Sequence, residues 1–136
     1  MIKRVHHIGI AVKDLKESIP LFESLLGVKP RLEEAPSQKV NEAIFRVGEG
    51  MEIDLMEPTG PDSTVAKFLE TRGEGLHHIA LEVDDINKEL KAMEKKGFRI
   101  IGNVSGEGVA GQTGFLHPKS VNGVLVELLQ LREGGE

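Results

Sequence analysis

The sequence predicts an α+β fold made of two tandem βαβββ modules related by pseudo-twofold symmetry. Three observations support this prediction. A histidine pair opens a strand-like run twice, in VHHIGIAVKDL from Val5 and in LHHIALEVDDI from Leu76. An Asp follows each run and precedes apolar residues at helical spacing, which is typical of a capped helix. Further strand-like runs, separated by glycine-containing turns, follow each helix.

The first module covers about residues 1–58 and begins with a strand predicted from Val5 to Val12. Asp14 is the expected N-cap of the next helix and Gly27 its C-terminal stop. Pro20 falls inside this helix, where a proline is expected to kink it or loosen its first turns. Three more strands are expected, over Lys29–Leu32, Lys39–Val47 and Met51–Met56.

A linker of about residues 59–75 joins the modules and contains a short helix over Ser63–Thr71, capped by Ser63 or Asp62. The second module, about residues 76–131, repeats the order of the first. Its expected strands are Leu76–Val83, Phe98–Ile101, Gly114–His117 and Gly123–Leu131, with a helix between Asp85 and Gly97.

The glycine-rich stretch 102–114 is expected to be a mobile loop, with Gln112 and Thr113 within reach of a ligand, and 132–136 a polar tail. Residues 1–136 thus form one domain.

Composition excludes several classes of protein. The chain has no cysteine, which excludes disulfides, thiolate nucleophiles and cysteine-type zinc sites. Its 17 basic and 22 acidic residues give a net charge of −5, without the basic excess of a nucleic-acid binder. No apolar run is long enough to cross a membrane, and the N-terminus leads into a strand rather than a signal peptide, so we expect a cytoplasmic protein. Exposed strand edges favour a homodimer.

The repeat also duplicates polar residues. Asp54 lies within the apolar run Ile53-Asp54-Leu55-Met56, and Glu127 lies at the matching place in Val126-Glu127-Leu128-Leu129. Buried carboxylates are costly unless they are paired or coordinate a cation. Together with one histidine of each pair, they form a nitrogen and oxygen ligand set for a divalent metal. This set suits Co, Mn, Ni, Fe or Mg as well as Zn, so the ion stays open here.

The stretches HHIGIAV, HHIALEV and GVLVELLQ resemble the vicinal oxygen chelate superfamily, which includes glyoxalase I, extradiol dioxygenases and fosfomycin-resistance proteins. Within it, PTGPDSTVAKFLETRGEGLHHIALEVDDI and FLHPKSVNGVLVELLQ resemble the methylmalonyl-CoA epimerase family. The resemblance spans nearly the whole chain. It implies a curved mixed sheet around a metal cleft, and a divalent ion that is Co²⁺ as first choice, or Mn²⁺, Ni²⁺, Zn²⁺ or Mg²⁺.

The resemblance also implies roles for individual residues. His7, His78 and Glu127 would bind the metal, and the fourth ligand falls at Asp54, where relatives tend to carry Gln or Glu. Because Asp is one methylene shorter, a bridging water or a slight strand shift is an alternative to direct coordination. His6 and His77 would be structural.

The implied reaction interconverts (R)- and (S)-methylmalonyl-CoA by proton transfer at the carbon between two carbonyls. Inversion needs a base and its conjugate acid on opposite faces of that carbon, and the resemblance indicates Glu127 and Glu42. Lys39 and Lys119 are candidates for contacts with the CoA portion. Two alternatives remain: a glyoxalase I-like lyase or isomerase acting on a glutathione adduct, and a metal-free small-molecule-binding module of the same fold.

Overall fold

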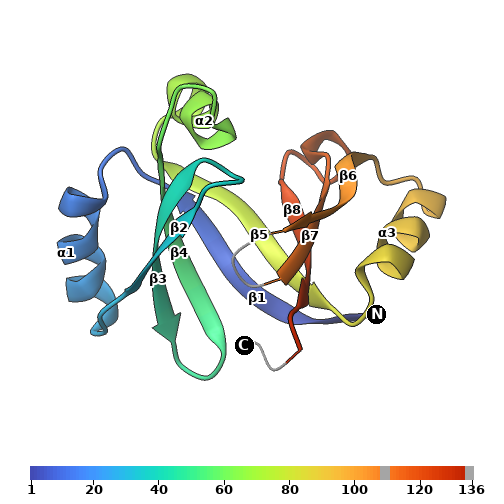
Figure 1. Cartoon of the computed structure of the whole chain (residues 1–136), viewed down its shortest axis with the longest axis horizontal. Coiled ribbons are helices and arrows are strands. Elements are labelled where there is room, and N and C mark those ends of the chain that lie inside the picture. Colours follow the sequence, from blue (N-terminus) through green and yellow to red (C-terminus); the bar gives the residue numbers. More distant parts are fainter. Residues whose placement is uncertain (108–110, 134–136) are drawn as a thin grey trace. The chain divides into compact units, whose positions relative to one another are not determined.

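The computed structural model describes residues 1–107 and 111–133, which form strands and helices in the order expected for an α+β fold (Figure 1). The strands are β1 (Ile2–Ala11), β2 (Arg31–Ala35), β3 (Val40–Val47), β4 (Met51–Pro58), β5 (Gly75–Val83), β6 (Ile100–Glu107), β7 (Gly111–Leu116) and β8 (Val126–Leu131). The helices are α1 (Leu15–Leu26), α2 (Thr64–Arg72), α3 (Ile86–Lys95) and the short 3₁₀ helix η1 (Pro118–Ser120). The predicted α+β class and the predicted order of elements are confirmed.

The chain divides into two compact units. The central unit is His7–His77, and the flanking unit combines Met1–His6 with His78–Glu136. Both boundaries fall inside a histidine pair, so each unit holds one histidine from each. Strands β1 and β5 therefore contribute residues to both units.

In the central unit, the strand order is β2-β3-β4-β1. Strand β1 pairs in parallel with β4, and β3 pairs antiparallel with both β2 and β4. Helix α1 covers one face, where its apolar residues Leu15, Ile19, Phe22 and Leu26 pack with Ala43, Phe45 and Leu55. Burial of this apolar face is the main driving force for docking α1.

Helix α1 starts and ends where the sequence predicts. The side chain of Asp14 accepts a hydrogen bond from the Lys16 backbone N–H, and Gly27 ends the helix with a left-handed φ of 74°. The helix continues through Pro20. Ser63, rather than Asp62, caps α2, because its hydroxyl accepts a hydrogen bond from the Val65 N–H.

The flanking unit repeats this arrangement with the order β5-β8-β7-β6. Helix α3 covers one face through the buried residues Ile86, Leu90 and Met93, which pack with Val83, Leu116, Val126 and Leu128. Asp85 caps α3, as predicted. The first N–H of the helix is satisfied in the same way in both units: Leu15 donates to Glu57, and Ile86 donates to Gln130. The duplication therefore extends to a side-chain contact at matching positions.

The glycine-rich stretch predicted as a mobile loop over 102–114 is mostly strand, so this prediction is wrong for the residues described; 108–110 lie outside them. Strands β6 and β7 pair on both sides of an irregularity in their register between Ile101 and Gly106. Two of the glycines allow close packing. A Cβ at Gly111 would lie 2.0 Å from the backbone oxygen of Gln130, and one at Gly114 would lie 2.7 Å from a methyl group of Leu90. Glycine composition here reflects close approach of backbone and side chains rather than a turn.

Among the residues that the structure describes, no helix is both long and apolar enough to cross a membrane.

Candidate metal centre and active site

The sheet of the central unit has one apolar and one polar face. Alternate residues of a strand point to opposite faces, so Ile53 and Leu55 of β4 face α1, while Glu52 and Asp54 face the other way. On β1, His7 and Gly9 share this second face, because they lie opposite Glu52 and Asp54 in the strand register. The second face is polar yet buried: His7 is 8% exposed, Asp54 4% and Glu52 7%.

His7 and Asp54 form an imidazole–carboxylate pair on this face. The Nε2 atom of His7 lies 3.7 Å from Oδ2 of Asp54. Asp54 stands opposite Gly9 in the register with β1. The central unit thus places one nitrogen and one oxygen donor side by side in a buried position.

The flanking unit contains the matching pair, His78 and Glu127. The Nε2 atom of His78 lies 3.1 Å from Oε1 of Glu127, and the two residues are 8% and 6% exposed. Glu127 stands opposite Ala80, another small residue. In both units, the carboxylate is therefore paired with the residue two positions after the histidine, Gly9 or Ala80.

Each pair fits a divalent metal by distance and by donor type. Ligand bonds from imidazole or carboxylate to a divalent transition metal are about 2.0–2.2 Å long, so two donors on one ion lie about 3 Å apart when adjacent and about 4 Å when opposite. The separations of 3.7 Å and 3.1 Å fall in this range. Imidazole nitrogen and carboxylate oxygen are also the donors that Co²⁺, Mn²⁺, Ni²⁺ and Zn²⁺ accept.

Glu42 is buried rather than solvent-facing. It is 8% exposed and lies on β3 opposite Met56, on the same face as Asp54. Its counterpart in the flanking unit is Thr113 of β7. Thr113 lies opposite Leu129 of β8 and is 3% exposed. The structure thus places Glu42 on the polar face of its unit, one step along the sheet from Asp54.

The other polar residues singled out from the sequence have structural contacts or remain exposed. The ring of His77 packs edge-on against Phe68 of α2, with ring centroids 4.9 Å apart. Lys39 forms an ion pair with Asp62, which ties the β2–β3 turn to the segment before α2. Lys119 is exposed on η1.

Two buried glutamates, Glu52 and Glu82, were not predicted from the sequence. Glu52 lies two residues before Asp54 on the same face of β4, and the alternation in MEIDLM could have revealed it. Glu82, on β5, binds Arg4 at 2.7 Å and Lys3 at 3.4 Å. Burial by itself would raise the pKa of Glu82, but the hydrogen bond and positive charge of Arg4, helped by Lys3, outweigh burial and lower this pKa below its ordinary value. Glu82 therefore stays ionised.

A fold of this kind also occurs in known proteins. Residues 6–116 match the family model described as the Glyoxalase/Bleomycin resistance protein/Dioxygenase superfamily. The chain belongs to this superfamily, and the predicted vicinal oxygen chelate fold is confirmed. Within it, the relatives identify the chain as a member of the methylmalonyl-CoA epimerase family.

Three relatives illustrate the similarity. The ethylmalonyl-CoA/methylmalonyl-CoA epimerase of Cereibacter sphaeroides is 38% identical over 96% of this chain and 100% of its own length. The crystal structure of methylmalonyl-CoA epimerase from Mycobacterium tuberculosis has a TM-score of 0.91 at 32% identity, covering 98% of this chain and 91% of that one. A methylmalonyl-CoA epimerase in complex with methylmalonyl-CoA and NH₄⁺ has a TM-score of 0.93 at 32% identity, covering 100% and 99%.

Proposed function

We propose that this chain is a divalent-metal-dependent epimerase that interconverts (R)- and (S)-methylmalonyl-CoA by proton transfer. The observation that carries the proposal is the repeated imidazole–carboxylate pair, His7 with Asp54 and His78 with Glu127, in the same strand register in both units. Similarity to methylmalonyl-CoA epimerases over nearly the whole chain supports the choice of substrate.

In the proposed site, His7, Asp54, His78 and Glu127 together hold one divalent ion. When bound, the ion supplies a Lewis acid that stabilises negative charge developing on the thioester and carboxylate oxygens of the substrate. Both histidines are buried, which limits access of water to their ring nitrogens and strengthens electrostatic interactions there. Co²⁺ is the first choice of ion, with Mn²⁺, Ni²⁺, Zn²⁺ and Mg²⁺ as alternatives.

Two carboxylates carry the proton transfer in this proposal. Glu42 removes the C2 proton from one epimer, and Glu127 returns a proton to the opposite face; the reverse reaction exchanges their roles. Burial of Glu42 favours this role, because a site that largely excludes water strengthens the electrostatic interactions that stabilise charge during proton transfer.

The test is proton NMR in deuterium oxide with methylmalonyl-CoA, using protein stripped of metal and then reloaded with Co²⁺. Loss of the C2 proton signal is expected with Co²⁺ and not without it. Exchange at full rate in the stripped protein would contradict metal dependence. No exchange in the reloaded protein, combined with conversion of a glutathione hemithioacetal, would replace the epimerase by a glyoxalase-like enzyme.

The proposed epimerase is a cytoplasmic homodimer. Strands β2 and β6 each pair along one side only, so each leaves backbone groups for contact with a second copy. Sedimentation equilibrium measures the mass of the assembly directly, and a mass of one chain at micromolar concentration would contradict the dimer. Fractionation of cells that express the chain tests the compartment.

A further inference from the structure

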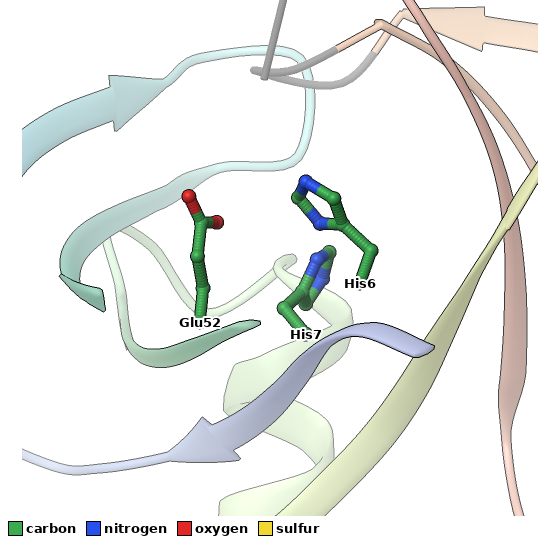
Figure 2. A group of neighbouring side chains, drawn as sticks. All are labelled: His6, His7 and Glu52. Carbon is green, nitrogen blue, oxygen red and sulfur yellow. The ribbon is translucent and has the colours of Figure 1, made fainter. Parts of the chain in front are cut away.

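Glu52 is a buried carboxylate that lies directly opposite His7. The two residues are register partners on the parallel strands β1 and β4. Figure 2 shows their side chains rising from these strands side by side, with His6 next along the chain. A carboxylate oxygen of Glu52 lies within 4.8 Å of a ring nitrogen of His7. The side chain is thus within reach of a cation on His7.

The direction of Glu52 is set by the sheet. Its neighbour Ile53 packs into the apolar cluster under α1, so Glu52 points to the opposite, polar face together with Asp54. Only 7% of Glu52 is exposed. The polar face of the central unit therefore carries two buried carboxylates beside one imidazole.

Glu52 carries a carboxylate on the largely buried polar face of the central unit. Arg46 is its register partner on β3. A carboxylate on a buried face is costly to keep ionised unless a cation lies beside it, and a bound metal ion is such a cation. The position of Glu52 beside His7 on this face therefore suits a metal ligand.

The two carboxylates approach His7 from different positions in the strand register. Asp54 stands opposite Gly9, two residues further along the strand than His7, which is a distance of about 6.6 Å along the sheet. Its side chain is also one methylene shorter than that of Glu52, a difference of about 1.5 Å. Glu52 stands opposite His7 itself, so its longer side chain runs beside the imidazole. Asp54 nevertheless brings Oδ2 to 3.7 Å from Nε2 of His7, so both carboxylates lie near the same imidazole.

We propose that Glu52 is a further ligand of the divalent cation bound by His7, and that it shares with Asp54 the carboxylate position of the central unit. The inference rests on the proposed function for the presence of a metal. A second carboxylate oxygen adds a hard donor, which raises the affinity for Mn²⁺ and Mg²⁺ relative to that for Zn²⁺.

The test measures Co²⁺ and Mn²⁺ binding to the full metal-stripped chain by isothermal titration calorimetry. The variants are Glu52→Ala, Asp54→Ala, the double variant and His7→Ala, with Glu49→Ala as a matched control in the exposed turn before β4. If the two carboxylates share one position, each single variant loses less than about tenfold in affinity, and the double variant falls to the level of His7→Ala. Circular dichroism and thermal unfolding confirm that each variant is folded.

Two results would overturn the inference. The first is a double variant that binds metal as well as Asp54→Ala does. The second is a crystal structure of Co²⁺-loaded Asp54→Ala in which no Glu52 oxygen lies within about 2.3 Å of the ion. The second result also separates a ligand from a hydrogen-bond acceptor that merely orients His7. Failure of the wild-type chain to bind Co²⁺ would instead contradict the proposed function.

Discussion

Replacing Glu42 by Gln tests whether Glu42 and Glu127 act as the two acid–base groups of the proton transfer. The change removes the base while keeping the size of the side chain and its place on β3. We expect the variant to bind metal as the wild type does and to lose epimerisation. The reason is geometric: Glu42 lies opposite Met56, two residues from Asp54 along β4.

The spacing suits a base that acts beside a metal without binding it. Two residues along a strand span about 6.6 Å, and neighbouring strands lie about 4.8 Å apart, so the Cα atoms of Glu42 and Asp54 are about 8 Å apart. A reacting carbon about 3 Å from an ion and about 3 Å from a base fits between them. Loss of a positioned base costs about a hundredfold to ten-thousandfold in rate, which corresponds to about 3–5 kcal/mol of transition-state stabilisation.

The assay follows both epimers of methylmalonyl-CoA in deuterium oxide by NMR, with metal content measured on the same samples. Inversion should fall by at least about a hundredfold from either epimer. Exchange without inversion should persist for the epimer whose C2 proton faces Glu127, because that base is intact. Glu34→Gln is the matched control, since Glu34 is exposed on the neighbouring strand β2. Inversion at the wild-type rate in Glu42→Gln, with metal bound, would refute the reasoning.

Three further predictions concern the stability of the fold around the site. Leu90→Ala should lower the free energy of unfolding by about 3 kcal/mol in urea titrations, because Leu90 is 2% exposed in the core under α3; a loss below about 1 kcal/mol would contradict this packing. Gly111→Ala should cost at least about 2 kcal/mol in the same assay, because the new Cβ would lie 2.0 Å from the Gln130 backbone oxygen; an unchanged midpoint would contradict that close approach. Glu82→Gln should cost about 1 kcal/mol at pH 7, after allowance for solvent screening at the partly exposed Arg4. Because the pKa of Glu82 is lowered in the folded chain, this contribution is present above its ordinary value of 4.5 and is lost as the pH falls through the lowered value. A difference between wild type and Glu82→Gln that persists at pH 2 would therefore count against the ion pair with Arg4.

Much of the secondary structure could be predicted from local signals in the sequence. Asp14, Ser63 and Asp85 cap helices because their short side chains accept hydrogen bonds from the first free N–H groups, an effect that needs no tertiary context. The repeated histidine pairs mark β1 and β5 for the same reason: the pattern lies within a few residues. Such features can be read directly from the chain.

Features that depend on distant contacts were not predictable in this way. The glycines at 111 and 114 suggested a loop, but their role is set by Gln130 on β8 and Leu90 on α3. Glu52 resembles an ordinary strand carboxylate until the register with His7 is known. Burial of Glu42 likewise depends on which face of β3 is covered. In each case, the deciding neighbour is far away in the sequence.

Comparison of the two units separates the conserved part of the duplication from the part that diverged. The imidazole–carboxylate pair is kept in both, with Gly9 and Ala80 as its small neighbours. Two other positions on the polar faces differ: Glu42 corresponds to Thr113, and Glu52 to Leu125.

Alignment of the chain with itself finds what the units share, which is why the sequence revealed the pairs and missed Glu52. An epimerase needs one acid–base group on each face of the reacting carbon, and the proposed pair combines Glu127 of a shared pair with Glu42, whose counterpart Thr113 is not acidic. The asymmetric residues are accordingly where the proposed base and the additional ligand lie. The double variant Glu42→Thr with Thr113→Glu should then retain metal binding and lose inversion in the NMR assay, because the proposed base no longer lies on β3. Inversion at the wild-type rate in this variant would contradict the proposed role of Glu42.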